Sequence, residues 1–520
     1  MPHMSPRYAA APRPASSAAH PVVVAGGGLV GLTLALDLAQ RGIGVVLLDE
    51  DDSVSAGSRA ICFAKRTLEI FARLGLGPRM LEKGITWNVG RVFAGERQLF
   101  EFDLLPDDGH EYPAFINLQQ YYVEEWLVEA CVATGRVDLR WRHKVTGVDS
   151  QPGGVTLTIE TPDGPYTLHT EWLLAADGAR SFVRHALDLP FVGRVFQDRF
   201  LIADVVMDAP FPTERWFWFD PPFHRHQSAL LHKQPDNVWR IDLQLGWDAD
   251  PELERQPERV IPRVQAMLGP DARFTLEWVS VYTFRCRRLE RFVHGRVVFV
   301  GDSAHQVSPF GARGGNGGVQ DADNLAWKLA SVLHGAPERL IQTYDDERIP
   351  AADENILHST RATDFITPKT PAARAYRDAA LSLAARHEFA RPLVNSGRLS
   401  RPCRIPVSGD TDGWGQPGLP AEDAPMVHEG RPDWLLRHLG PGYTLVVFGP
   451  DTPALPGITT VRIAPDALHD VRGLAATRYA SPPGGCVLLR PDQHVAACFT
   501  RFDAARILAL TGAPRMERAA

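Results

Sequence analysis

The sequence predicts an α/β protein of several domains, and three observations support this prediction. The chain has 520 residues, which is too long for one ordinary hydrophobic core. Near the N-terminus a short apolar run leads into glycines and then a helical pattern, as in domains built on a parallel sheet. Farther along, apolar and polar residues alternate with the period of β-strands. A segment rich in Pro and Gly then separates the C-terminal part of the chain from the rest.

The bulk composition excludes several classes of protein. The net charge of −7 does not predict nucleic acid as a partner. No apolar run is long enough for a membrane span. The six cysteines have neither CxxC nor metal-ligand spacing and are expected to be reduced thiols of a cytoplasmic protein. Residues 1–20 are rich in Ala, Pro and Ser, which favours a disordered tail and leaves a transit peptide as an alternative.

The first motif is a dinucleotide-binding fingerprint. The apolar run Val22–Ala25 predicts a buried strand, and it is followed by GGGLVG at residues 26–31 and a helical pattern over 32–41. Its three spaced glycines permit a tight turn, the approach of a pyrophosphate and close packing of helix on strand. Asp49 ends the next apolar run and is expected to bind a ribose, with Glu50 as the alternative. The fingerprint does not distinguish FAD from NAD.

Two later motifs follow further predicted strands. DGARSFVR begins at Asp177, after the strand predicted at 172–176, and alone it indicates no more than a turn. The second begins at Gly301 and runs through a glycine-rich segment into a helix predicted at 319–333. Asp302 can hold sugar-like hydroxyls, and open amides at a helix N-terminus favour negative charge, such as that on the N1–C2=O2 edge of a reduced flavin.

With these three motifs in this order, residues 21–370 resemble the class A flavoprotein aromatic hydroxylases, of the para-hydroxybenzoate and phenol hydroxylase type. The resemblance rests on GGGLVG, DGARSFVR and GDSAHQVSPFGARGGNGGVQDADNLAWKL. It implies a Rossmann-like FAD-binding domain with an inserted antiparallel β-sheet substrate domain. It further implies that NAD(P)H and O2 are used to hydroxylate a phenolic substrate through a flavin C4a-hydroperoxide.

The resemblance also implies roles for individual residues. Asp302 would bind the ribityl chain, Asp177 would lie near the pyrophosphate, and Pro309 would lie where substrate and flavin meet. Together with the fingerprint, the expected FAD-binding residues are Gly26, Gly28, Leu29, Val30, Gly31, Asp49, Arg59, Gln120, Val145, Asp177, Asp302, Gly314, Gly315 and Asn316. Two positions, Gln119 and Arg313, depart from the family pattern. Arg313 could favour an anionic flavin, favour an acidic substrate, or face water.

The segment 187–285 is rich in aromatic residues and predicts an antiparallel substrate sheet, to which residues 85–115 would contribute. His232 is the candidate catalytic residue that could bind or deprotonate a phenol, with a structural histidine as the alternative. His224, His226 and His232 lack the partners of a metal site, so no metal is predicted. Arg225 or Arg240 would suit a carboxylated phenol, or could be surface charges.

The predicted domain order is a tail at 1–20, an FAD-binding domain at 21–186 and 286–395, the substrate domain at 187–285, a linker at 396–425 and a C-terminal domain at 426–520. The last domain resembles thioredoxin but lacks CxxC, so a structural or dimer-related role is expected. The alternatives to hydroxylation are epoxidation or ring opening by a related oxygenase, a non-oxygenating flavin oxidoreductase, and a flavin-binding assembly protein. The identity of the aromatic substrate, the choice between NADH and NADPH, and a homodimer stay open.

Overall fold

The computed structural model describes residues 5–14, 19–57, 59–209, 211–394, 399–407, 412–449 and 451–511. Ser58, next to the predicted cofactor residue Arg59, lies outside these residues, as do parts of the predicted tail, linker and C-terminal domain. The chain divides into two compact units. The first holds residues 1–106, 113–345 and 352–401, and the second holds 107–112, 346–351 and 402–520.

The first unit contains the predicted parallel sheet. Its strands run in the order β17-β18-β11-β1-β2-β8, and the pairs β18–β11, β11–β1, β1–β2 and β2–β8 are parallel. An antiparallel excursion, β9–β10, leads back into β11. The strands are β1 (Ala19–Ala25), β2 (Val45–Asp49), β8 (Val137–Trp141), β9 (Lys144–Gln151), β10 (Gly154–Glu160), β11 (Tyr166–Ala175), β17 (Val293–His294) and β18 (Val297–Phe299).

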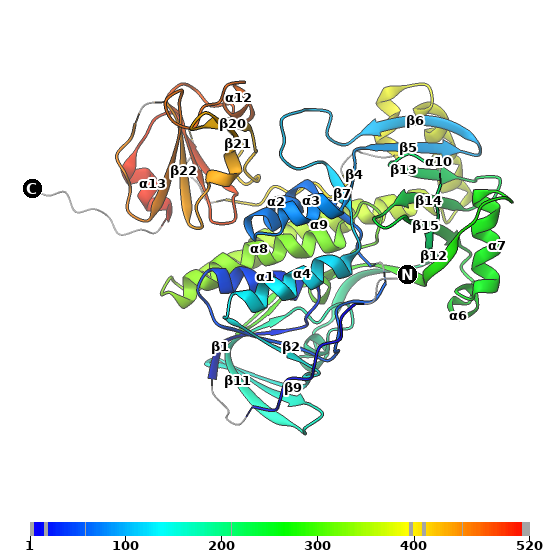
Figure 1. Ribbon diagram of the computed structural model, residues 1–520, viewed down its shortest axis with the longest axis horizontal. Coiled ribbons are helices and arrows are strands. Elements are labelled where there is room, and N and C mark those ends of the chain that lie inside the picture. The colour runs from blue at the N-terminus through cyan, green and yellow to red at the C-terminus, as the bar shows by residue number, and fades with distance from the viewer. Residues whose placement is uncertain are drawn as a thin grey trace, which may run out of the picture. The chain divides into compact units, whose positions relative to one another are not determined.

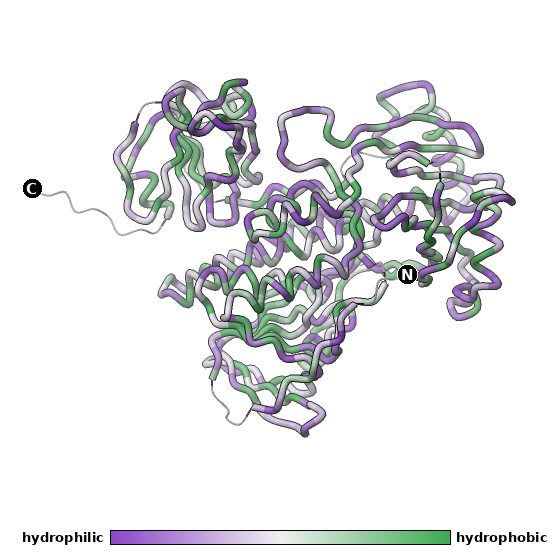
Figure 2. Tube along the Cα trace, viewed as in Figure 1, coloured by the Kyte–Doolittle hydropathy of each residue, from purple (hydrophilic) through white to green (hydrophobic). Residues whose placement is uncertain are grey.

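Helices cover one face of this sheet (Figure 1). Helix α1 (Leu29–Gln40) packs against both α4 (Gln120–Ala133) and α8 (Gly314–Leu333). Residues 22–25 of β1 and 45–48 of β2 are apolar and almost fully buried, and Figure 2 shows the sheet as a hydrophobic band. The other helices of the unit are α2 (Lys65–Arg73), α3 (Gly77–Lys83), α5 (Phe182–Ala186), α6 (Pro251–Glu254), α7 (Pro257–Leu268), α9 (Arg339–Ile366), α10 (Pro371–Ala384) and α11 (Arg391–Val394). Residues 346–351 of α9 belong to the second unit.

A second sheet of the first unit has the order β19-β16-β12-β15-β14-β13-β5-β6. The pairs formed within residues 187–285 are all antiparallel, as predicted. Strand β13 also pairs with β5 of the 85–115 segment, and this pair is parallel. Residues 85–115 supply β5 and β6 to it, along with two strands of a separate three-stranded sheet, β3-β7-β4. The strands are β3 (Cys62–Ala64), β4 (Ile85–Trp87), β5 (Val89–Ala94), β6 (Arg97–Asp103), β7 (Phe115–Asn117), β12 (Phe191–Val206), β13 (Arg215–Phe219), β14 (Ser228–Lys233), β15 (Val238–Leu245), β16 (Thr275–Leu289) and β19 (His305–Gln306).

The second unit contains a four-stranded mixed sheet in the order β23-β22-β24-β25, with β22 and β23 parallel and the other pairs antiparallel. A separate hairpin, β20–β21, precedes it. Two buried apolar clusters lie on this sheet. The elements are β20 (Pro425–His428), β21 (Arg431–Trp434), β22 (Tyr443–Phe448), β23 (Ile458–Ile463), α12 (Leu474–Tyr479), β24 (Cys486–Leu489), β25 (Val495–Phe499) and α13 (Ala504–Thr511).

The N-terminal tail departs from the prediction of disorder over residues 5–14. The Tyr8 ring stacks on Trp141 with 4.6 Å between centroids, and the carbonyl of Ala11 lies 2.9 Å from His143 Nε2. These contacts join the tail to strand β8 and the residues after it, so an Ala- and Pro-rich composition did not prevent order here. In the described part of the chain, no helix combines the length and hydropathy needed to cross a membrane.

Candidate active site

The glycine-rich turn after β1 forms the first part of the site. Gly26 has a φ of +107°, and a methyl group at this position would lie 2.4 Å from the carbonyl oxygen of Ala176. A methyl group on Gly31 would lie 1.9 Å from the carbonyl oxygen of Gly26. Around Gly28, by contrast, a Cβ would meet one atom within 4 Å, Oε1 of Glu124 at 3.7 Å. The turn therefore packs tightly on its inner side and is open at Gly28, which suits an approaching pyrophosphate.

Asp49 lies beside this turn at the end of β2. Its Oδ2 accepts a hydrogen bond from the Gly27 amide, and its Oδ1 accepts one from the Asp51 amide at 2.8 Å. Burial raises the pKa of the Asp49 carboxyl, and the two amide bonds oppose that shift. Glu50, the alternative ribose ligand, forms an ion pair with Lys144 instead. The geometry places Asp49 where the fingerprint expects an acid that binds a ribose.

Glu124 is a site residue that the sequence analysis missed. It is fully buried in α4, and its Oε1 accepts a hydrogen bond from the Leu29 amide at 2.8 Å. Its Oε2 accepts bonds from the amide and the hydroxyl of Ser55, at 2.8 and 2.6 Å. The Leu29 amide, which was expected to serve the cofactor, is thus occupied by a carboxylate. The available signal was the spacing of Gln120 and Glu124, which lie four residues apart on one helix face.

Asp177 follows β11 and lies against Gly26. Its Oδ2 accepts a hydrogen bond from the Val183 amide at 3.0 Å, whereas its Oδ1 is buried with no hydrogen-bond partner in the described structure. Desolvation raises the pKa of this carboxyl, opposed by its hydrogen bonds. A buried acceptor without a donor costs about 1–3 kcal/mol. Asp177 therefore has an oxygen available for a ligand hydroxyl, which fits a bound dinucleotide.

Asp302 is exposed to solvent yet closely surrounded by protein. Desolvation raises the pKa of its carboxyl, and the positive fields of His305 and Arg59 oppose that shift. Its side chain makes no hydrogen bond to any described residue, and neither does the exposed side chain of Arg59. The tertiary structure thus brings together an acid and an arginine that are far apart in sequence, and both are open to a ligand.

The glycine-rich third motif ends at the N-terminus of α8, which begins at Gly314, five residues earlier than predicted. The amides of Gly314, Gly315 and Asn316 lie in the first turn, where a helix offers no backbone acceptor. The Asn316 side chain accepts from the Ala64 amide at 2.9 Å and donates to the Cys62 carbonyl at 2.8 Å. Asn316 thereby fixes the turn against β3 and leaves its backbone amide for an anionic group.

The other predicted cofactor residues lie around the same strand ends. Gln120 accepts a hydrogen bond from the Ala60 amide at 2.9 Å, beside Arg59. Val145 lies two residues after His143 in the chain. The His143 amide donates a hydrogen bond to the Asp49 carbonyl at 2.8 Å, which brings this segment next to the end of β2. The fingerprint, Asp177 and Asp302 follow β1, β11 and β18, adjacent parallel strands whose carboxyl ends meet at one edge. This edge is where open α/β sheets bind ligands, and its donors and free carboxylates fit FAD.

A cavity of about 640 Å³ adjoins the third motif through Phe310, Gly311 and Arg313. Its walls are mainly aromatic and aliphatic, with four arginines: Arg91, Arg215, Arg313 and Arg361. Arg313 is buried and donates to the Phe310 carbonyl at 3.0 Å, so the alternative in which it faces water was wrong. Pro309 is exposed next to these lining residues. Residues 91, 92 and 102 of the 85–115 segment line the cavity as well.

His232 does not line this cavity but lies buried on β14. Its Nδ1 is 3.9 Å from Sγ of Cys62, and its Nε2 has no hydrogen-bond partner in the described structure. Burial lowers the pKa of His232 well below its usual range, and the nearby Arg215 and Arg240 lower it further. The imidazole is therefore neutral at pH 7.

The two arginines suggested from sequence for an acidic substrate do not line the cavity. Arg240 is buried, forms an ion pair with Asp242 at 2.9 Å and donates to the Arg59 carbonyl. Arg225 is exposed. Of the histidines considered for a metal, the His224 ring bonds the Gln244 carbonyl at 2.6 Å, and His226 is exposed.

Comparison with known proteins agrees with this geometry. Residues 19–359 match the family described as "FAD binding domain". The chain is 30% identical over 503 residues to a flavin-dependent monooxygenase of Mycobacteroides abscessus, covering 91% of this chain and 96% of that protein. It is 33% identical over 519 residues to 6-methylpretetramide 4-monooxygenase of Streptomyces rimosus, covering 92% and 90%.

Among solved structures, anhydrotetracycline hydroxylase from Streptomyces rimosus matches with a TM-score of 0.74 at 25% identity, covering 96% of this chain and all of that one. These three matches cover 91%, 92% and 96% of this chain, so they extend well beyond the nucleotide-binding part. The chain therefore belongs to the FAD-dependent monooxygenase family of flavoprotein hydroxylases.

Proposed function

We propose that this enzyme uses NAD(P)H and O2 to hydroxylate an aromatic substrate that has several fused rings and an acidic phenol or carboxylate. The observation that carries the proposal is the arginine-lined cavity next to the third motif. Two relatives support the choice of substrate class, since they are named for oxidising 6-methylpretetramide and anhydrotetracycline.

The size of the cavity supports more than one ring. A protein cavity of about 150 Å³ holds benzene, whereas this cavity measures about 640 Å³. Its aromatic walls, with Phe217 and Phe219 on β13 and Phe310 on the motif loop, suit face and edge contacts with a planar polycycle. A single-ring phenol would leave much of this space to water.

The charges of the lining residues support an acidic substrate. Arg91 is neutralised by Glu214, to which its Nη2 donates at 3.1 Å. The side chains of Arg215 and Arg361, in contrast, form no ion pair or hydrogen bond with any described residue. Asp364, an acidic residue of the lining, pairs with Arg194 at 3.0 Å. The cavity thus presents two uncompensated guanidinium groups, which would stabilise a phenolate or carboxylate.

We propose that an arginine binds the acidic group of the substrate and that His232 contributes less to the reaction. When bound, FAD would supply hydride acceptance from NAD(P)H and the activation of O2. Arg215 would hold the phenol as its phenolate, which is the better nucleophile for oxygen. His232, with its lowered pKa, holds a proton poorly. Because His232 lies outside the cavity lining, we propose that it has a structural role and that the phenol releases its proton to solvent.

The test is oxidation of NADH and NADPH in air by the flavin-loaded enzyme, with single-ring phenols and hydroxylated polycyclic aromatics as candidate substrates. We expect a polycyclic acid to accelerate oxidation and to gain one oxygen atom by mass spectrometry. Acceleration by single-ring phenols alone would contradict the proposed substrate class. Hydrogen peroxide without an oxygenated product, for every compound, would contradict oxygenation itself.

Substitutions separate substrate binding from cofactor binding. Arg215→Met is expected to raise KM for the acidic substrate at least tenfold while the bound flavin stays constant. Arg225→Met serves as the matched control, because Arg225 is exposed and outside the cavity lining. His232→Gln, which keeps a hydrogen-bonding group, is expected to retain most of kcat. A loss of activity in His232→Gln with a shifted pH profile would assign proton transfer to His232.

A further inference from the structure

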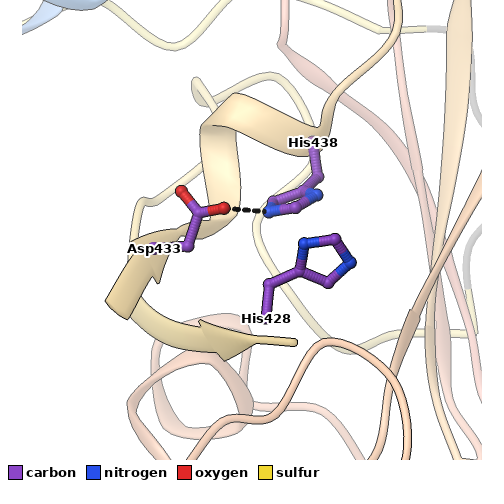
Figure 3. Close-up of side chains that lie close together, drawn as sticks. All are labelled: His428, Asp433 and His438. Atoms are coloured by element: carbon purple, nitrogen blue, oxygen red, sulfur yellow. Dashed lines mark hydrogen bonds and ion pairs between the residues drawn. The ribbon is translucent and has the colours of Figure 1, made fainter. Parts of the chain in front are cut away.

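His428, Asp433 and His438 form a compact cluster in the C-terminal unit, outside every motif of the flavin site. Each residue offers one ligand atom, and these atoms all lie within 4.8 Å of one another. Figure 3 shows the carboxylate of Asp433 and the two imidazole rings gathered around one small region of space. We propose that this cluster is a binding site for a divalent transition-metal ion of the zinc type.

The local fold holds the cluster in place. Strands β20 and β21 form a hairpin whose turn residues, Glu429 and Gly430, both have positive φ, as the tight primed turn of a two-residue hairpin requires. His428 pairs with Arg431, and Asp433 pairs with Met426. His428 and Asp433 are therefore diagonal neighbours on one face of the hairpin. The sheet register brings the first imidazole and the carboxylate together.

The third ligand comes from the one-turn helix that follows β21 at once, η3 (Leu435–His438). This turn is anchored by the fully buried Leu435, whose amide donates to the Ala424 carbonyl at 3.0 Å. The Leu436 amide donates to the Asp423 carboxylate at 3.1 Å. The anchored turn holds the His438 ring beside Asp433, with Nε2 2.9 Å from Oδ2.

The hydrogen bonds around Asp433 orient its two oxygens differently. Oδ1 accepts from the Trp434 amide at 2.9 Å and lies 3.5 Å from Nη1 of Arg437. Oδ2 faces His438. Metal-binding carboxylates and histidines are oriented by such neighbouring bonds. Arg437 is the competing cation here, but it also pairs with Glu111, which draws its charge away from Asp433.

The donor set selects the class of ion. Two imidazoles and one carboxylate suit zinc and its neighbours, whereas calcium and magnesium prefer oxygen ligands alone. Ligand atoms lie about 2.0–2.2 Å from zinc, so the cluster must contract slightly. The His428 side chain is exposed and forms no hydrogen bond with a described residue, and its ring packs edge-on against the His438 ring with 4.8 Å between centroids. Binding would require the His428 ring to turn from this contact toward the ion. His438 would bind through Nε2 with its proton on Nδ1, and water would complete the coordination.

A bound ion would join the hairpin to the turn that follows it. A two-stranded hairpin alone is marginally stable, and β20–β21 forms its own two-stranded sheet. Metal coordination by His428 and His438 would cross-link residues from both ends of this segment. The consequence is a C-terminal unit that is more resistant to heat with the ion than without it.

The experiment uses the full-length flavoprotein after treatment with a chelator. Titration with cobalt(II) is expected to give visible absorption bands of a four-coordinate ion, without thiolate charge-transfer bands, because all six cysteines are buried. Calorimetry with zinc chloride is expected to show one tight site per chain. His428→Ala should weaken zinc binding at least tenfold, and zinc should then no longer raise the melting temperature.

The matched control is His387→Ala, which removes an exposed histidine of the first unit and should leave binding unchanged. The exposed His428 side chain forms no hydrogen bond with a described residue, so its replacement is expected to change the melting temperature of the metal-free protein little. Equal zinc affinity in the parent, His428→Ala and His438→Ala would overturn the proposal. The proposal would also be overturned if His428→Ala, His438→Ala and the control His387→Ala all weakened zinc binding to the same small extent.

Discussion

Buried carboxylates serve opposite purposes in the two units of this molecule. In the first unit, Asp177 has a buried oxygen without a donor, and desolvation raises its pKa. In the second unit, the buried Asp492 is held by Arg490, which also binds Glu347 through two hydrogen bonds of 2.8 Å. Although burial alone would raise the pKa of Asp492, Arg490 and His494 hold it well below its usual range.

The difference teaches how to separate a binding group from a structural one. A buried carboxylate whose charge is balanced within the protein is costly to leave without its partner, and it has no free oxygen to offer. A carboxylate that is desolvated without a full set of donors lowers the stability of the free protein, and it recovers that energy when a ligand supplies the donor. Asp177 and Asp302 belong to the second kind, while Asp492 and Glu347 belong to the first.

The largest expected effect comes from breaking the balanced network of the second unit. Arg490→Met leaves Glu347 and Asp492 buried without their guanidinium, which costs about 3–5 kcal/mol. We expect a clear drop in melting temperature by calorimetry, with unchanged flavin content per folded chain. Arg462→Met is the control, because Arg462 pairs with the exposed Asp451 and Asp466 and its loss should change little. Equal effects of the two substitutions would contradict the comparison.

The second effect is at the glycine-rich turn of the first unit. Gly31→Ala places a methyl group 1.9 Å from the Gly26 carbonyl oxygen, which must push α1 away from β1. We expect at least a tenfold loss of FAD affinity, measured by fluorescence titration of the flavin-free protein. Gly44→Ala is the control, since no atom lies within 4 Å of its added methyl group. FAD binding by Gly31→Ala at parental strength would refute the proposed cradle.

Acid titration sharpens the comparison between the carboxylates. The pKa of Asp492 is lower in the folded protein than in the unfolded chain, whose value is about 3.9. Its contribution to stability is therefore complete above that value and is lost as the pH falls through the folded pKa. We expect the melting temperature of the parent to approach that of Arg490→Met in acid. A constant difference across this pH range would mean that Asp492 is not the titrating partner.

The smallest expected effect is a gain in stability, and it comes from removing the charge of Asp177. Because the folded pKa of Asp177 is raised, stability falls as the pH rises above the unfolded pKa, and the loss is complete above the folded pKa. Asp177→Asn should stabilise the flavin-free protein at pH 7, measured as a higher melting temperature. The gain should shrink as the pH falls and the parental carboxyl takes up a proton. The substitution should also weaken FAD binding. A variant that is less stable than the parent and binds FAD equally well would contradict the assignment of Asp177 as a binding group.

The sequence predicted the parts of the site that depend on local spacing. The glycines of residues 26–31, the acid at the end of β2 and the helix after the third motif all lie within short segments, where backbone rules act between near neighbours. Glu124 was missed because its partners, Leu29 and Ser55, are more than sixty residues away. Of the cavity arginines, Arg313 was singled out from the sequence, whereas Arg91, Arg215 and Arg361 were missed for the same reason as Glu124. Nothing local distinguishes Arg215 from a surface charge.

By itself, the sequence determined the order of strands, glycine turns and helices that builds a nucleotide-binding sheet, and with it the family. Tertiary structure alone decided which charges stay unpaired. Arg215 is uncompensated in the cavity because β13 lies beside β5 in an unexpected parallel pair, where Glu214 is taken by Arg91. The physical reason is that burial and ion pairing are set by neighbours distant in the chain, whereas turns and helix starts are set by neighbours a few residues away.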